Sequence, residues 1–121
     1  MADSPGSPDS PGSPGSPGSP EVLDPQAIEA ALAHLPGWRA AGAVLLREVE
    51  APTFLRGIDL VNAVAQVAET LDHHPDIDIR WRTVTFRLST HTAGGVTGKD
   101  LELAERIEHL VAGIEPPEVD A

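Results

Sequence analysis

The chain has 121 residues, enough for one domain, and contains no cysteine, so disulfides, thiolate catalysis and cysteine-bound zinc are excluded. Its formal net charge of −11 argues against nucleic acid as the main partner, because neutralising phosphates requires a basic patch. No segment has the roughly 20 apolar residues that a membrane span needs. We therefore expect a cytoplasmic protein that binds neither nucleic acid nor membrane.

The two ends of the chain differ in composition from the part between them. Residues 1–20 are almost entirely Ser, Pro and Gly, without apolar side chains that would offset the entropy lost on ordering. We predict a disordered tail over residues 1–22, a folded domain over residues 23–114 and a flexible acidic end over residues 115–121. A folded part of about 90 residues has a small core, so we also expect a homodimer or homotetramer that buries more surface.

The domain is predicted to begin with a helix and two strands. Asp24-Pro25 is typical of a helix start, and apolar residues then recur at helical spacing until Pro36-Gly37 stops them. Two short strands are expected between Trp38 and Val49, with a turn near Ala41-Gly42.

A long second helix should follow. Thr53 is its expected cap, and Pro75 ends it because the residue before a proline resists helical geometry. The predicted buried stripe of this helix comprises Phe54, Ile58, Val61, Ala65, Ala68 and Leu71.

A hairpin is predicted after Pro75. Two runs of apolar residues alternate with polar ones, namely Ile77, Ile79 and Trp81, and then Val84, Phe86 and Leu88. A two-residue turn at Arg82-Thr83 pairs Trp81 with Val84 and places all six apolar side chains on one face of the hairpin. The same register places His91 opposite His74.

A third helix completes the predicted fold. Thr97 is its expected cap, with Asp100 in a capping-box position and Gly113 at its end. Its predicted buried stripe comprises Leu101, Ala104, Ile107 and Val111. The order helix, two strands, helix, two strands, helix predicts an α+β fold, a four-stranded antiparallel sheet with three helices packed on one face.

Three histidines form the one predicted cluster of reactive groups. His73 and His74 end the second helix, and the hairpin brings His91 to them. Glu69 lies four residues before His73 on the same helical face, where it is expected to orient that imidazole. Imidazole titrates near neutral pH, so such a cluster suits proton transfer.

The cluster has other possible interpretations. It could be purely structural, as is expected for the isolated His34 and His109. Three imidazoles can also bind zinc, but adjacent histidines point in divergent directions and the spacing matches no zinc signature. Nucleophilic catalysis by Ser or Thr lacks a recognisable motif. Proton transfer is therefore the favoured interpretation.

These residues resemble the signature of the pterin-4a-carbinolamine dehydratases. The resemblance rests on Glu69-x-x-x-His73-His74-Pro75, followed by Trp81, Ser89-Thr90-His91, Ala93-Gly94-Gly95-Val96-Thr97 and the run that begins at Asp100. It covers about residues 23–113 and includes Leu35-Pro36-Gly37-Trp38.

The resemblance implies an enzyme, a hydro-lyase that removes water from 4a-hydroxytetrahydropterin to give quinonoid dihydropterin. The implied chemistry needs acid and base groups on a shared pocket, and neither a metal nor an organic cofactor. The implied catalytic residues are His73, His74, His91 and Glu69, with His73 and His91 as the acid–base pair and His74 mainly a substrate contact. The implied substrate-binding residues are Trp38, Trp81, Ser89, Thr90 and Asp100, although Trp38 could equally belong to the core.

Two other functions remain open for a chain of this family. Some relatives act as dimerisation cofactors of a transcription factor or in the assembly of other proteins, and a pterin-binding protein could serve another pterin pathway. A binding module of this kind would not need the complete set of histidines. Because this chain keeps His73, His74 and His91, the resemblance favours the enzyme.

Overall fold

Seven elements make up the computed structural model, which describes residues 21–114; the predictions for residues 1–20 and 115–121 lie outside this range. In chain order the elements are α1 (Pro25–Leu32), β1 (Trp38–Ala41), β2 (Val44–Glu50), α2 (Phe54–Leu71), β3 (Asp76–Arg80), β4 (Thr83–Leu88) and α3 (Gly98–Ile114). None of the helices described over residues 21–114 is long and apolar enough to cross a bilayer.

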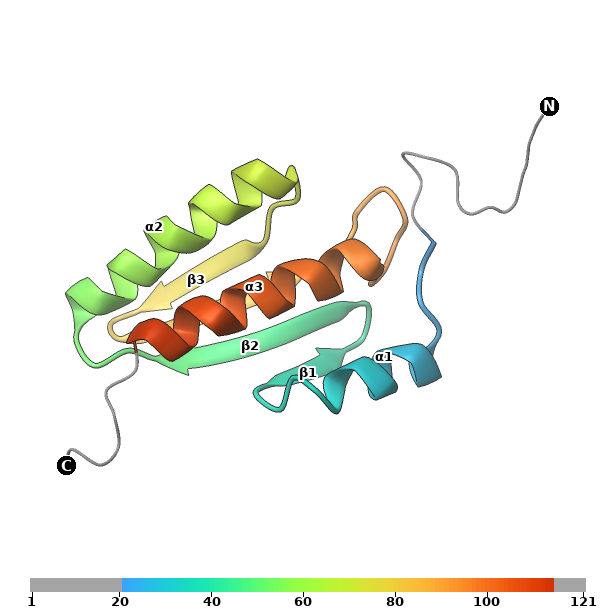
Figure 1. Ribbon diagram of the computed structural model, residues 1–121, viewed down its shortest axis with the longest axis horizontal. Coiled ribbons are helices and arrows are strands. Elements are labelled where there is room, and N and C mark those ends of the chain that lie inside the picture. The colour runs from blue at the N-terminus through green and yellow to red at the C-terminus, as the bar shows by residue number, and fades with distance from the viewer. Residues whose placement is uncertain (1–20, 115–121) are drawn as a thin grey trace.

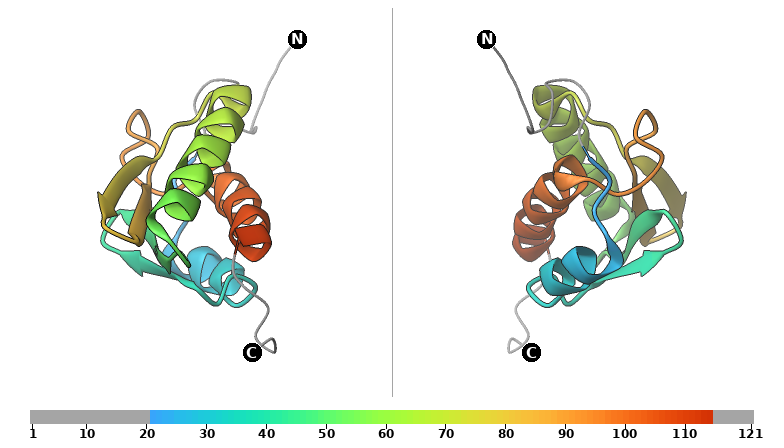
Figure 2. Two further views of the ribbon diagram at one scale, coloured as in Figure 1. Left: turned by 90° about the vertical axis from the view of Figure 1, so that its left-hand side faces the viewer. Right: turned by 90° about the vertical axis from the view of Figure 1, so that its right-hand side faces the viewer.

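The four strands form one antiparallel sheet in the order β1-β2-β4-β3. α2 and α3 run side by side over this sheet, and α1 lies beside β1 (Figure 1). Figure 2 shows that all three helices occupy the same side of the sheet. The predicted α+β fold, with helices on one face of a four-stranded antiparallel sheet, is confirmed.

The core lies between the inner face of the sheet and the helices. The central strands β2 and β4 supply Leu45, Val49, Val84, Phe86 and Leu88, each at most 1% exposed. Alternation along each strand sends every second side chain to this face, so the central strands carry the densest apolar surface. α2 and α3 cover that surface.

The first helix starts where the sequence predicts. Asp24 Oδ1 accepts a hydrogen bond from Ala27 N at 2.8 Å, and Pro25 is the first helical residue. The helix ends at Leu32, three residues earlier than the apolar spacing indicates. Leu35 follows in a turn and is buried in the core, so its helical spacing reflects packing of the connecting turn.

The second helix is capped as predicted but buries a different face. Thr53 Oγ1 accepts from Arg56 N at 3.1 Å. The buried residues are Gly57, Leu60, Val64 and Ala68, whereas Phe54 is 47% exposed and Ala65 is also exposed. Gly57 lies on this face, and a Cβ there would lie 3.4 Å from a methyl of Val84, so the helix packs directly on the sheet along this row. Of the predicted stripe, Ala68 alone is fully buried.

The β3–β4 hairpin has its turn one residue earlier than predicted, which shifts the pairing of the two strands by two residues. Ile77 pairs with Phe86 and Ile79 with Val84, which places the turn at Trp81-Arg82. Trp81 adopts a left-handed φ of 54°, and the Arg82 backbone carbonyl accepts from Ala51 N at 2.8 Å, which ties this turn to the end of β2. A shift of two residues keeps every paired side chain on its predicted face. Only Trp81 leaves that face.

The third helix begins with the predicted capping box. Thr97 N donates to Asp100 Oδ2 at 2.9 Å, and Thr97 Oγ1 accepts from Lys99 N at 3.2 Å. The helix buries Asp100, Leu103, Ala104, Ile107 and Val111, so the predicted stripe holds except that Leu103 is more deeply buried than Leu101. Gly113 lies within the helix, which ends one residue later.

Candidate active site

The end of α2 sets the position of the two adjacent histidines. The helix stops at Leu71, four residues before Pro75, because Asp72 takes a left-handed conformation (φ 54°, ψ 44°). The N–H of Asp72 bonds back to Ala68 and Glu69, and the N–H of His73 donates to the Ala68 carbonyl at 3.0 Å. This six-to-one bond is typical of a left-handed helix ending. His73 is thereby fixed to the helix although it lies beyond it.

His73 is held by a buried carboxylate. Its Nε2 lies 2.6 Å from Oδ1 of Asp100, and the side chain of Asp100 is 0% exposed. The other oxygen, Oδ2, accepts from Thr90 Oγ1 at 2.8 Å and from Thr97 N at 2.9 Å. A buried carboxylate needs such a full set of donors. Asp100 therefore anchors the His73 ring, and its own side chain is fully buried and does not line the cavity.

Glu69 pairs with the other histidine. Its Oε2 lies 2.6 Å from Nε2 of His74, and both side chains are largely exposed. The predicted pairing of Glu69 with His73 is wrong, because the left-handed Asp72 turns the chain after the helix, so helical spacing no longer describes residue 73. Each of the two adjacent histidines thus has its own carboxylate, one buried and one exposed.

His91 reaches the same pocket from a short closed loop. The loop is pinned by Thr90, whose N–H donates to the Gly95 carbonyl at 2.9 Å and whose carbonyl accepts from Gly94 N at 2.9 Å. Gly94 has a φ of +80°, which a glycine adopts without strain. The β3–β4 register does not extend to His91, because β4 ends at Leu88. The loop, not the ladder, brings His91 to the other histidines.

One cavity of about 540 Å³ contains all three histidines. Its lining comprises Asp72, His73, His74, Pro75, Asp76, Ser89, Thr90, His91, Thr92 and Lys99. Lys99 adds a positive charge that the sequence analysis missed, and nothing in its local pattern distinguishes it from an ordinary surface lysine in a first helical turn. Its position beside the histidines follows only from where α3 starts.

The predicted substrate-binding residues divide into two groups. Ser89 and Thr90 line the histidine cavity, although Thr90 is buried and gives its hydroxyl proton to Asp100. Trp38 does not line it: it is 5% exposed in the core, and its Nε1 donates to Glu108 at 3.0 Å. Trp81 does not line it either, because it lies in the β3–β4 turn, at the opposite end of β3 from the histidines. It is 72% exposed, and the Arg82 guanidinium carbon lies 4.8 Å from the centre of its ring.

No group of three His, Asp or Glu side chains within residues 21–114 is arranged to hold a metal ion. Two of the histidines instead direct one ring nitrogen each to a carboxylate.

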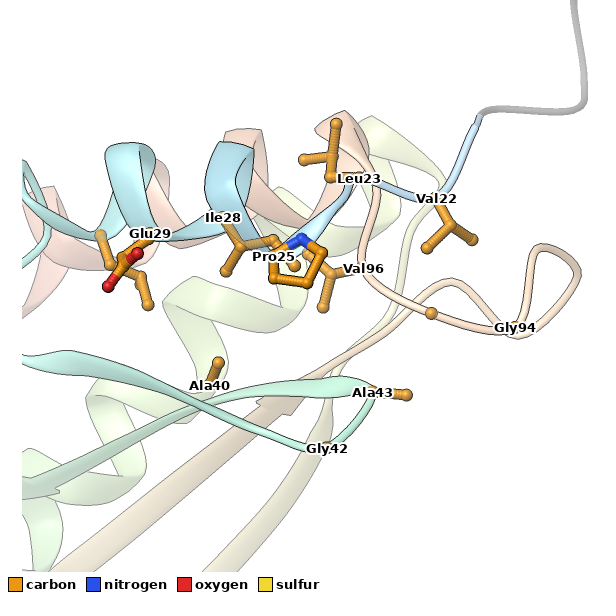
Figure 3. Close-up of a pocket in the computed structure, with 12 residues that line it drawn as sticks. Val22, Leu23, Pro25, Ile28, Glu29, Ala40, Gly42, Ala43, Gly94 and Val96 are labelled. Atoms are coloured by element: carbon orange, nitrogen blue, oxygen red, sulfur yellow. The ribbon is translucent and has the colours of Figure 1, made fainter.

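A second cavity of about 530 Å³ lies between α1, the β1–β2 turn and the Gly94-Gly95 loop. Figure 3 shows that its labelled walls are mainly aliphatic side chains and glycines, including Val22, Ile28 and Val96, with Glu29 as the charged group. It contains none of the predicted site residues, and Glu29 is its one titratable lining residue, without a second proton-transfer group beside it. The histidine cavity is therefore the candidate active site.

The arrangement is suited to moving protons at two points of one bound molecule. A carboxylate on one imidazole nitrogen orients the ring and leaves the other nitrogen free to give or take a proton. His73 has this arrangement from a buried partner, whereas His91 lines the same cavity from its own loop. Two imidazoles in one cavity can act as acid and base in the same reaction.

Comparison with known sequences agrees with this geometry. A sequence profile of the family described as pterin 4 alpha carbinolamine dehydratase matches residues 21–110. A Mycolicibacterium smegmatis protein assigned by name to the pterin-4-alpha-carbinolamine dehydratases is 57% identical over 91 residues, covering 75% of this chain and 97% of that protein. A Mycobacteroides abscessus protein with the same name is 60% identical over 87 residues, covering 72% of this chain and 93% of that protein.

Solved structures show the same fold. The crystal structure of a transcriptional coactivator/pterin dehydratase from Brucella melitensis has a TM-score of 0.73 and 27% identity, over 75% of this chain and 99% of that one. A pterin dehydratase-like protein described as a RuBisCO assembly factor in the alpha-carboxysome has a TM-score of 0.52 at 17% identity and shows the shared fold alone. With the profile covering most of the chain, the chain belongs to the pterin 4 alpha carbinolamine dehydratase family.

Proposed function

We propose that this protein dehydrates 4a-hydroxytetrahydropterin to quinonoid dihydropterin. The observation that carries the proposal is the single cavity that gathers His73, His74 and His91, with His73 anchored on a buried carboxylate. The family membership and the names of the relatives support the same reaction.

The reaction requires two proton transfers. The C4a–O bond breaks as the 4a-hydroxyl receives a proton and leaves as water, while N5 loses its proton and forms the double bond to C4a. Hydroxide is a poor leaving group, so a positioned general acid and base lower the barrier, typically by about 10²- to 10⁴-fold for one such group. The proton lost at N5 equals the proton consumed at oxygen, so the enzyme ends in its starting state after the two groups re-equilibrate.

The histidines divide this work by their surroundings. His73 and His91 are the proposed acid–base pair, because they come from different loops and can address different atoms of one bound pterin. His74 is a proposed binding contact, held by the exposed Glu69. Lys99 and Ser89 line the same cavity and are proposed to contact the polar edge of the pterin ring.

The test is a dehydration assay on the full chain. The 4a-hydroxytetrahydropterin is generated by a turning-over phenylalanine hydroxylase, and its disappearance is followed by absorbance against a control without the protein, because the spontaneous reaction is appreciable. We expect clear acceleration over the control. If the protein binds a pterin but gives no acceleration, the non-catalytic binding module becomes the better description.

A further inference from the structure

Buried hydrogen bonds connect the start of α3 to the histidine cavity. Lys99 N donates to Thr97 Oγ1 at 3.2 Å, Thr97 Oγ1 lies 2.8 Å from Thr90 Oγ1, and Thr90 Oγ1 lies 2.8 Å from Asp100 Oδ2. Thr97 and Asp100 are 0% exposed and Thr90 is 5% exposed. Because solvent hardly reaches these groups, each must find its partner within the protein.

The donor and the acceptor in each of these hydrogen bonds follow from the number of available protons. A threonine hydroxyl has one proton, and the carboxylate of Asp100 can only accept. Thr90 therefore gives its proton to Asp100, which leaves Thr97 as the donor in the contact between the two threonines. Thr97 in turn uses a lone pair to accept from Lys99 N. All of these hydrogen bonds therefore point in one direction, from Lys99 N through the two threonine hydroxyls to the Asp100 carboxylate.

The hydrogen bonds of Asp100 determine which ring nitrogen of His73 carries the proton. Oδ2 of Asp100 is occupied by Thr90 Oγ1 and by Thr97 N, so Oδ1 is left for Nε2 of His73 at 2.6 Å. With Asp100 as a carboxylate, Oδ1 can only accept, and the bond then requires the proton on Nε2. In the neutral ring, Nδ1 is then the proton acceptor.

The other ring nitrogen, Nδ1, is not engaged by the carboxylate. Nδ1 of His73 has no hydrogen bond to the described residues, while the side chain lines the cavity and is 11% exposed. A pterin in the cavity would meet His73 at this atom.

We propose that Thr97 and Thr90 are positioning residues that act through Asp100 to fix the ring orientation and the tautomer of His73, so that Nδ1 is the atom that exchanges a proton. The last step rests on the proposed dehydration, whereas the tautomer and its support do not. Neither threonine hydroxyl bonds to His73, and the hydrogen bonds of both lead to the Asp100 carboxylate, so their proposed effect passes through it.

Crossed substitutions separate the hydroxyl group from the shape of each threonine. Thr90→Val and Thr97→Val keep the shape and remove the hydroxyl, whereas Thr90→Ser and Thr97→Ser keep the hydroxyl and remove the methyl. We expect the two Val variants to lose about 10- to 10²-fold in kcat, as a small misplacement of a catalytic group does, with KM changed less than about twofold. The Ser variants should keep kcat near that of the parent. If the Val variants keep the parental kcat, or the Ser variants lose as much as the Val variants, the hydroxyl chain has no positioning role.

A second measurement does not depend on activity. Nuclear magnetic resonance of protein with ¹⁵N-labelled histidine, at about pH 9 where imidazole is neutral, distinguishes the protonated ring nitrogen from the bare one. The His73 signals are assigned by their loss in His73→Ala. We expect a protonated Nε2 with slow proton exchange in the parent and in the Ser variants, and faster exchange in the Val variants.

The resonance experiment also decides the cases that kinetics leaves open. A parent with the proton on Nδ1 of His73 would overturn the proposal, even where a Val variant does not fold. If the parent fails to dehydrate the pterin, the proposed function fails. Slow exchange of a proton on Nε2 in the parent, together with faster exchange in the Val variants, would still support the positioning role.

Discussion

Oδ1 of Asp100, in the first turn of α3, lies 2.6 Å from Nε2 of His73, just beyond the end of α2. The two residues are 27 positions apart in the sequence, and their bond joins the ends of the two helices that cover the sheet. The carboxylate is fully buried while the histidine lines the cavity. The capping box that starts α3 thus serves two purposes, since Asp100 both caps the helix and anchors the proposed acid–base group.

Asp100→Asn should lower kcat by about 10²- to 10⁴-fold, the range expected when a general acid–base group loses its orientation. All three contacts of the Asp100 carboxylate come from donors, and an amide offers a donor of its own on one side. Either one contact is lost or the His73 ring takes the other tautomer. The unfolding free energy should fall by about 1–3 kcal/mol, because a buried polar group loses a partner.

Asp59→Asn is the matched control, since it makes the same chemical change on the exposed side of α2. Steady-state dehydration kinetics and denaturant unfolding of both variants check the prediction. Parental kcat in Asp100→Asn, with the fold intact, would show that the buried carboxylate does not act through His73.

Glu69→Gln should have a much smaller effect. Its pair with His74 is exposed to solvent, and exposed pairs contribute about 0–1 kcal/mol. We expect unchanged stability within that range, an unchanged kcat and a KM raised by a few-fold, because His74 is a proposed binding contact. Steady-state kinetics of Glu69→Gln and Asp100→Asn check this, since the first should change mainly KM and the second mainly kcat. A fall in kcat as large as that of Asp100→Asn would mean that His74 takes part in proton transfer.

The sequence indicates the residues of the site more reliably than their pairing. The capping-box spacing of Thr97 and Asp100 is local, so it survives unchanged in the structure. The partner of Glu69 depends on the left-handed Asp72, a non-glycine residue whose conformation no pattern in the sequence announces. Four-residue spacing predicts a contact only while the helix continues, and this helix ends at Leu71, two residues before His73.

The hairpin shows the same distinction between face and register. Alternation of apolar residues predicts which side chains face the core, and this holds for Ile77, Phe86 and their neighbours. The register depends on the turn, which is set by a backbone bond from Ala51 to Arg82 across the sheet end. Trp81 is apolar and in phase with the strand, so periodicity alone places it inside, whereas the turn leaves it exposed.

Trp38→Phe tests the assignment of this tryptophan to the core. Its Nε1 bonds to Glu108, which also accepts from Arg47 Nε at 2.6 Å, and together they connect β1, β2 and α3. Removing the donor should lower the unfolding free energy by about 1–3 kcal/mol, as expected for a hydrogen bond to a charged group. kcat and KM per folded molecule should not change, because Trp38 does not line the histidine cavity. A raised KM at unchanged stability would return Trp38 to the substrate site.

Removal of metal tests the remaining alternative for the histidine cluster. If the histidines transfer protons, protein purified and assayed in excess chelator should keep its full rate and melting temperature. Ligands of a functional metal would instead lose activity on chelation, and a structural site would lose stability because metal binding is coupled to folding. Elemental analysis of the untreated protein provides the control, and stoichiometric metal together with chelator-sensitive activity would contradict the proton-transfer account.

The rate of the double variant His73→Ala with His91→Ala tests the central claim most directly. Each single change should lower kcat, His73→Ala by about 10²- to 10⁴-fold, the typical contribution of one positioned general acid, and His91→Ala by less if the two groups partly substitute for one another. The double variant should remain folded by circular dichroism and give almost no dehydration above the control without protein. A folded double variant that accelerates dehydration near the parental rate would contradict the account, since the acid and the base would then lie elsewhere.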